Sequence, residues 1–153
     1  MALTFRAATA ADIPAIIALL HDDGLGKSRE VPGDPPHPAY LDAFRAMQAQ
    51  PGNEVILAVA EDGGIVGCIQ YTRIHGLSRR GMARAQIEGV RVAAGRRGQK
   101  IGEALIGHAI ERARAEGCGL VQLTSDKRRA DAIRFYERLG FTASHEGLKL
   151  ALD

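Results

Sequence analysis

The stretch VRVAAGRRGQKIGEAL, residues 90–105, joins two different hydrophobic periodicities. Before it, apolar residues alternate as in a β-strand, and after it they recur every three or four residues as in an α-helix. The junction holds four basic side chains and three glycines. Because a helix start carries unpaired N–H groups and a partial positive charge, and glycines let the backbone approach an anion, this pattern predicts a phosphate-binding loop. The alternative is a solvated basic loop.

Two common phosphate-binding motifs do not fit the spacing at this junction. A Walker A loop needs adjacent Gly and Lys followed by Ser or Thr, and residues 90–105 contain neither feature. The dinucleotide motif GxGxxG is excluded because the glycines stand at positions 95, 98 and 102.

The segment RRGQKIGEAL resembles the Q/R-x-x-G-x-G/A pyrophosphate loop of the GNAT superfamily of acyl-CoA-dependent N-acetyltransferases. Arg97 matches the leading residue and Gly102 the closing glycine, whereas Lys100 stands where the family usually has its middle glycine. The upstream IEGVRV and the downstream DAIRFYERLGF resemble further family segments, so the resemblance covers most of the chain.

The resemblance implies that acetyl-CoA is the co-substrate and that this loop holds its diphosphate. In the family, a bulge in the preceding strand frees backbone groups for the pantetheine arm. Gly89 fits such a bulge, because a glycine inside a strand often marks one; the alternative is a glycine that eases a twisted sheet. The residues implied to contact the co-substrate are Val90, Arg91, Val92, Arg97, Gly98, Gln99, Lys100, Ile101, Gly102 and Glu103.

In the family, an amine attacks the thioester of acetyl-CoA directly, and in members that use a base here a carboxylate at the position of Glu88 takes the amine's proton, directly or through water. Deprotonating an amine with a pKa near 10 costs roughly 4 kcal/mol at pH 7. Regular alternation would put Ile87, Gly89 and Arg91 on one face of the strand, and Glu88 on the other with Gln86, Val90 and Val92. The alternative for Glu88 is a structural carboxylate paired with an arginine.

The segment DAIRFYERLGF resembles the family's A-x-x-F-Y-x-x-x-G-F segment. The resemblance implies that Tyr136 donates a proton to the departing CoA thiolate. A tyrosine pKa near 10 keeps the hydroxyl protonated at pH 7, as a donor requires. The alternative is an ordinary core tyrosine. Many relatives carry Asn seven residues earlier, where this chain has Arg129, so that contact with pantetheine is not carried over.

The hydrophobic pattern predicts the element order β-α-α-β-β-β-α-β-α-β-β in one domain over residues 1–153. The expected fold is α/β of the GNAT type, with a mixed, mostly antiparallel central sheet and about four flanking helices. A helix is expected over residues 128–139 and a final β-hairpin over 141–152. By family analogy, the acceptor approaches residues 22–40, where four carboxylates would attract a cation: Asp22, Asp23, Glu30 and Asp34.

Composition limits the remaining functions. The chain has 153 residues, of which 46% are hydrophobic, and a net charge of only +2, so a nucleic-acid-binding module is not expected. No apolar run approaches the ~18 residues of a membrane span, and Arg6 and Asp12 interrupt the apolar run that a signal peptide needs, which predicts a cytoplasmic protein. The five histidines and two cysteines show no ligand spacing, so no metal is expected.

The sequence therefore predicts an N-acetyltransferase that acts on a small-molecule primary amine, and the resemblance adds a homodimer as a candidate assembly. Two alternatives share the same fold. One is a protein or peptide N-acetyltransferase, and the other is a non-catalytic sensor that binds acetyl-CoA.

Overall fold

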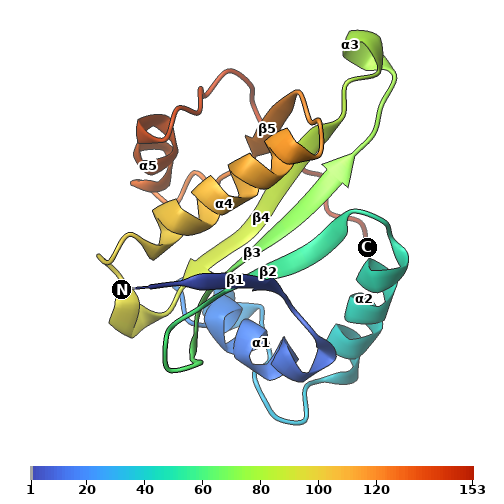
Figure 1. Cartoon of the computed structure of the whole chain (residues 1–153). Helices are drawn as coiled ribbons and strands as arrows, with labels where there is room; N and C mark the ends of the chain where they lie inside the picture. The colour runs from blue at the N-terminus through green and yellow to red at the C-terminus, as the bar shows by residue number, and fades with distance from the viewer. Residues whose placement is uncertain (1) are drawn as a thin grey trace. The chain divides into compact units, whose positions relative to one another are not determined.

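The computed structural model describes residues 2–153, which form two compact units, residues 2–122 and Leu123–Asp153. A five-stranded sheet dominates the first unit, and its strands lie in chain order (Figure 1). Each of the first four strands pairs antiparallel with its neighbour. The strands are β1 (Thr4–Ala7), β2 (Asn53–Val59), β3 (Ile65–Ile74), β4 (Arg84–Val92) and β5 (Leu120–Leu123).

Strand β5 runs parallel to β4. The Gly119 N–H donates to the Ala83 carbonyl at 2.8 Å, and the Gln122 amide donates to the Gln86 side chain at 2.7 Å, at the same sequence offset. A helical crossover joins the two strands, as parallel neighbours require. At this offset β5 ends beside Ile87, so residues 88–92 of β4 continue past its end. The predicted mixed, mostly antiparallel sheet is confirmed.

Helices cover both faces of the sheet in the first unit (Figure 1). Helices α1 (Ile13–His21) and α2 (Pro38–Ala49) lie on one face, and α4 (Ile101–Ala115) lies on the other. Ile16 of α1 packs with Leu57 and Cys68, whereas a Cβ at Gly67 would meet Leu105 of α4 at 2.9 Å. The apolar residues of α1 and α4 are therefore the surfaces that these two helices bury against the sheet.

The β-bulge predicted at Gly89 is present. Cys68 pairs with Arg91 and Gln70 with Glu88, so residues 89 and 90 of β4 stand opposite Ile69 alone. Gly89 has a φ of 59°, which a glycine adopts at little cost.

The bulge changes which side chains share a face of β4. Residues directly opposite in an antiparallel pair project to the same side, so Glu88 and Arg91 both lie on the α1 face with Cys68 and Gln70. Val92 stands opposite Gly67 and lies on the α4 face. The expectation that Arg91 and Glu88 occupy opposite faces was wrong, because one extra residue shifts the alternation.

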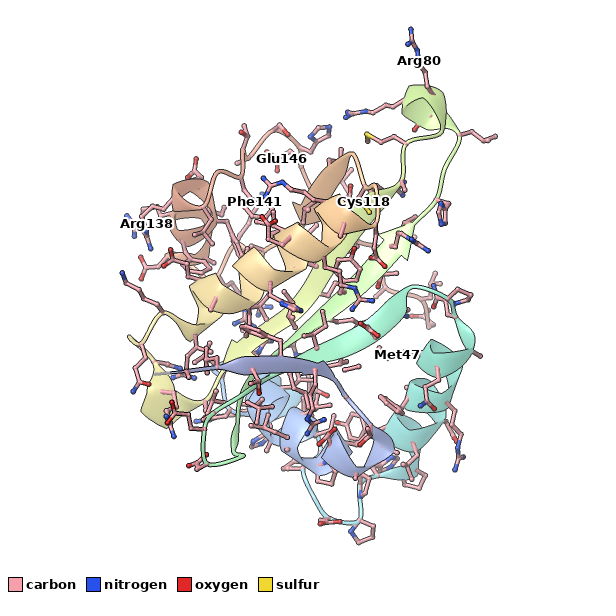
Figure 2. All side chains as sticks on the ribbon, viewed as in Figure 1. Met47, Arg80, Cys118, Arg138, Phe141 and Glu146 are labelled. Atoms are coloured by element: carbon pink, nitrogen blue, oxygen red, sulfur yellow. The ribbon has the colours of Figure 1, made fainter. Side chains whose placement is uncertain are left out.

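Short helical turns complete the first unit. Three 3₁₀ turns span Ala10–Asp12, Gly26–Ser28 and Ala94–Arg96. The one-turn helix α3 (Ser78–Gly81) lies in the β3–β4 connection, where Arg79 and Arg80 have φ values of 53° and 60°. Arg80 lies at the outer end of this connection (Figure 2).

The second unit departs from the prediction in two places. Helix α5 (Ala132–Arg138) begins four residues later than expected. The reason is a turn before it: the Asp126 side chain accepts from the Arg128 N–H at 2.9 Å, and its carbonyl accepts from the Arg129 N–H. An aspartate that bonds its own backbone in this way competes with helix formation.

The expected hairpin over residues 141–152 was also wrong, since residues 141–153 contain no strand. Leu148, Leu150 and Leu152 alternate as a strand would, yet their exposed fractions are 93%, 86% and 89%. Alternation describes what a strand can bury, but a strand forms only where a neighbouring strand supplies ladder hydrogen bonds.

The start of α1 is held by Asp12. Its carboxylate accepts two hydrogen bonds from Arg6, at 2.8 and 2.9 Å, and two more from the N–H and hydroxyl of Thr9. Asp12 is 8% exposed, and the Arg6 contact, with those of Thr9, lowers the pKa of its carboxyl to about 2.

We expect Asp12→Asn to lower the free energy of unfolding by about 1–3 kcal/mol at pH 7, because the variant loses charge-assisted hydrogen bonds. A depressed folded-state pKa stabilises the fold above the unfolded value near 4 and loses this effect as pH falls through about 2. Urea unfolding should therefore show the difference between wild type and variant shrinking from pH 5 to pH 2. A constant difference over this range would contradict the assignment.

Candidate functional site

The predicted anion-binding loop leads into α4. The helix begins at Ile101, and its first helical hydrogen bond runs from the Ala104 N–H to the Lys100 carbonyl at 3.0 Å. The N–H groups of Ile101, Gly102 and Glu103 therefore have no partner from the helix itself. These donors and the helix dipole favour a negative charge at this point.

Lys100 adopts the conformation that a glycine would normally supply. It precedes α4 with φ 62° and ψ 24°, in the left-handed region, and Gly98 has a φ of 82°. A left-handed residue with a Cβ costs roughly 1–2 kcal/mol. Lys100, where the family usually has a glycine, thus adopts the left-handed backbone conformation that a glycine would supply. It adds a cation to the loop at a cost in backbone strain.

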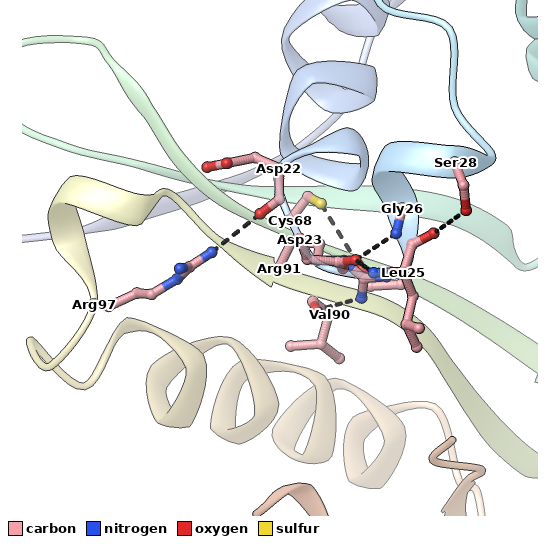
Figure 3. A network of polar contacts seen from close by, with 10 residues as sticks. Asp22, Asp23, Leu25, Gly26, Ser28, Cys68, Val90, Arg91 and Arg97 are labelled. Atoms are coloured by element: carbon pink, nitrogen blue, oxygen red, sulfur yellow. Dashed lines mark hydrogen bonds and ion pairs between the residues drawn. The ribbon is translucent and has the colours of Figure 1, made fainter. Parts of the chain in front are cut away.

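Two arginines anchor this loop to the rest of the first unit. The Arg97 guanidinium donates to the Asp22 carbonyl at 3.1 Å, just after α1 (Figure 3). Arg96 lies 3.9 Å from Asp62 in the β2–β3 turn. Arg97 and Lys100 are both exposed and add positive charge next to the helix start.

Two side chains donate to the backbone carbonyl groups at the β4 bulge. The Cys68 thiol contacts the Gly89 carbonyl at 3.5 Å, and the Arg91 guanidinium donates to the Val90 carbonyl at 2.9 Å (Figure 3). Burial raises the pKa of the Cys68 thiol to about 12, so it stays protonated as a donor. The bulge is thus held in place by its own neighbours.

The Arg91 side chain is committed to the protein. Its Nε atom lies 2.7 Å from a carboxylate oxygen of Asp23, and the two side chains are 17% and 12% exposed. The resemblance implies that the backbone of Val90, Arg91 and Val92 lies along the co-substrate. The ion pair involves only the Arg91 side chain, so it does not test this prediction. It does overturn the expectation that Asp23 serves as a carboxylate for attracting the acceptor.

Glu88 is exposed and stands opposite Gln70, one residue beyond the point where β5 ends. No ion pair of Glu88 is found among the residues that the structure describes. Glu88 is thus the last residue of β4 in the regular ladder with β3 before the bulge, and it has no β5 residue beside it.

A row of polar side chains surrounds Glu88 on the same face, which we call the polar row. Its members are Asn53, Gln70, Thr72, Gln86 and Gln122. Asn53 accepts from Gln70 at 3.0 Å and from Thr72 at 3.2 Å, and Gln122 donates to Gln86. Gln70, Thr72 and Gln86 face the same way as Glu88 because their strand partners do.

Sequence reasoning missed the polar row, although a signal was present. In β3 and β4, polar residues stand at alternate positions whose intervening neighbours are apolar. Those neighbours, Ile69, Tyr71, Ala85 and Ile87, are at most 1% exposed. A strand that buries one face and carries amides on the other near a candidate base indicates a binding surface.

Tyr136 lies in α5, in the second unit. Its ring packs edge-on against Phe135 and Phe141, with ring centroids 5.1 and 5.8 Å apart. The Phe141 N–H donates to the Tyr136 carbonyl, and Gly140, with a φ of 99°, ends the helix as the sequence predicts. The aromatic contacts fix the ring, and the proposed proton-donor role of its hydroxyl stays a prediction.

No three or more His, Cys, Asp or Glu side chains within residues 2–153 gather closely enough to hold a metal ion. No helix in this range combines the length and the apolar character needed to span a membrane.

Comparisons with known proteins agree with this geometry. The profile of the acetyltransferase (GNAT) family matches residues 20–141. Streptothricin acetyltransferase of Streptomyces lavendulae is 33% identical over 122 residues, which cover 74% of this chain and 61% of that protein. Aminoalkylphosphonate N-acetyltransferase of Salmonella typhimurium is 36% identical over 107 residues, covering 70% and 68%. The chain thus spans under two thirds of the first relative.

A solved structure from Bacillus halodurans C-125, described as a transcriptional regulator, is 46% identical with a TM-score of 0.94, and the match covers 99% of this chain and 100% of that one. The GNAT-type fold class and the resemblance found in the sequence are confirmed, as is the acyltransferase class at the level of the family. By its loop, its bulged strand and the profile that matches most of its length, the chain belongs to the acetyltransferase (GNAT) family.

Proposed function

We propose that the chain transfers an acetyl group from acetyl-CoA to a primary amine of a small molecule, by direct attack in a ternary complex. One observation carries the proposal: a single strand, β4, presents Glu88, then the bulge, and then leads into the start of α4. A general base, a deformed strand edge and an anion-binding helix terminus thus follow one another along fifteen residues of chain, from 88 to 102.

The start of α4 has the chemistry to hold a diphosphate. Its donors are the N–H groups of Ile101, Gly102 and Glu103, and its cations are Arg97 and Lys100. Gly98 and Gln99 form the turn between them. In this proposal the pantetheine arm lies along the backbone of residues 90–92, where one N–H polarises the thioester carbonyl.

The proposed reaction exchanges a C–S bond for a C–N bond, and the acceptor nitrogen loses two protons. Glu88 takes the first proton from the ammonium form of the acceptor, directly or through water. The amine nitrogen then attacks the carbonyl carbon and the C–N bond forms; this nitrogen releases its second proton to solvent as the C–S bond breaks. Tyr136 gives its hydroxyl proton to the departing thiolate, and solvent returns a proton to Tyr136 and accepts the one held by Glu88.

Two observations support a small acceptor. Streptothricin and aminoalkylphosphonates, which the two relatives are named for, are small molecules. The polar row next to Glu88 offers amide and hydroxyl groups that suit a compact polar amine better than an apolar one. A screen of CoA release with polyamines, amino acids, amino sugars, aminophosphonates and peptides tests the acceptor class, and acetylation of peptides alone would favour the protein-directed alternative.

The Bacillus halodurans neighbour favours one second candidate, a regulatory domain that binds acetyl-CoA without turnover. Calorimetric binding of acetyl-CoA with no CoA release across the screen would support this candidate over catalysis.

Replacing Glu88 by Gln is expected to lower kcat/KM at pH 7 by roughly 10²–10⁴-fold, because the acceptor loses its proton acceptor. The rate optimum should move to higher pH, where the amine deprotonates in solution. Glu61→Gln is the matched control, since Glu61 is an exposed carboxylate in the β2–β3 turn. A pH profile unchanged in Glu88→Gln would remove Glu88 as the base.

Replacing Tyr136 by Phe keeps the ring contacts with Phe135 and Phe141 and removes only the hydroxyl. We expect kcat to fall roughly 10²-fold or more, with the calorimetric Kd for CoA within about twofold of wild type. Parallel losses in kcat and CoA affinity would count against proton donation.

Lys100 allows strain and charge to be separated. Lys100→Gly should raise the free energy of unfolding by roughly 1 kcal/mol, because it relieves the left-handed strain. It should also weaken CoA binding by about threefold to tenfold, as expected for one exposed cation. Lys100→Gln is the control, with the same loss of affinity and no gain in stability. Tighter CoA binding in either variant would contradict the role of Lys100 in holding the diphosphate.

A further inference from the structure

The ion pair between Asp23 and Arg91 joins two segments that are far apart in the sequence. Asp23 lies just after α1, at the start of the loop that leads to α2, and Arg91 lies two residues after the bulge glycine (Figure 3). Their side chains are 12% and 17% exposed. A charge pair withdrawn from water to this degree is costly to break on one side only, because the remaining charge loses its compensation.

Asp23 also shapes its own loop. Its second carboxylate oxygen accepts hydrogen bonds from the N–H groups of Leu25 and Gly26. Gly26 is buried, and a Cβ there would lie 1.9 Å from the Leu20 carbonyl oxygen, so the chain folds tightly back on the end of α1. One carboxylate therefore fixes the local turn and, through Arg91, the position of that turn on the sheet.

Arg91 fixes the other side of the contact. Its guanidinium donates to the Val90 carbonyl and so holds the bulge in the conformation that the pairing with β3 imposes. Leu20 approaches the same place, 3.7 Å from where a Cβ on Gly89 would lie. Arg97 reaches the Asp22 carbonyl from the loop before α4. Residues 20–23 thus contact β4 and the loop that follows it at three points.

We propose that Asp23 and Arg91 are positioning residues that set the distance between the loop of residues 22–30 and the β4 bulge. This proposal rests on the proposed function, in which β4 presents the thioester and the loop borders the acceptor. Both carboxylate oxygens of Asp23 already have partners within the protein. Asp23 therefore affects acceptor binding by positioning the loop and not by attracting the acceptor directly. Neither residue is a catalytic residue.

The first test needs no activity. Hydrogen exchange of the Leu25 and Gly26 amides is measured in wild type and in Asp23→Asn, whose amide oxygen still accepts from both N–H groups. We expect exchange to accelerate about tenfold, corresponding to the loss of one charge-assisted contact. Arg91→Met should have the same effect from the opposite strand. Unchanged exchange at both amides in both variants would overturn the proposal.

The second test separates positioning from charge. Asp22→Asn removes the same charge one residue away, where the side chain is exposed and only the carbonyl contacts Arg97. In Asp23→Asn, the acceptor KM should rise at least about tenfold while the Kd for CoA stays within about twofold. A comparable rise in Asp22→Asn would show simple electrostatic attraction and would overturn the positioning role.

The double variant Asp23→Asn/Arg91→Met completes a thermodynamic cycle. Residues that act as one unit are not additive, so the double variant should resemble the worse single variant in acceptor KM. Additive effects would overturn the pairing. If wild type releases no CoA with any acceptor, the proposed function fails by itself, and the exchange experiment still decides whether the pair fixes the loop.

Discussion

The extra residue that β4 inserts opposite Ile69 is the constraint on which the rest of the site depends. Without it, the strand would continue in regular alternation, and Arg91 would project to the α4 face, away from Asp23. With it, Glu88 and Arg91 share the α1 face, and the strand turns toward the start of α4. Gly89 permits this because a φ of 59° is accessible to glycine. The Cys68 and Arg91 side chains then donate to the carbonyl groups that the bulge leaves outside the ladder.

The two faces of the sheet have different tasks, and their chemistry differs accordingly. On the α4 face, the fully buried Tyr71 donates a 2.6 Å hydrogen bond to Glu116, and Arg112 lies over its ring at 4.8 Å while pairing with Glu54. Burial and Glu116 raise the pKa of Tyr71, so its hydroxyl remains a donor. These contacts secure the carboxyl-terminal end of α4 to β2 and β3.

The α1 face carries polar groups that are only partly enclosed. The amides of the polar row satisfy one another in part, and each still has hydrogen-bonding capacity for a ligand. Glu88 is the one carboxylate in register with that row on β4. A sheet that secures α4 on one face and carries partner-seeking polar groups on the other is the arrangement expected of a scaffold that positions a reaction.

Much of the fold was predictable from local signals. The stripes of α1 and α4, the β2–β3 hairpin and the glycine that marks the bulge all follow from periodicity and backbone preference, which act over a few residues. Two predictions failed for different reasons: one expected strand had no neighbouring strand, and one helix start was displaced by a local side-chain turn. The leucines of residues 148–152 have the alternation of a strand, and the segment before α5 has the composition of a helix, but an aspartate turn displaced its start.

By itself, the sequence determined the bulge at Gly89, and it predicted an anion-binding loop and named Glu88 and Tyr136 as candidates, because motifs are properties of neighbouring residues. Only the tertiary structure decided that Arg91 faces Asp23, that Lys100 bears left-handed strain, and that amides from four strands meet beside Glu88. Pairing register and side-chain partners link residues distant in the chain, and no local pattern encodes which partner a charge will find.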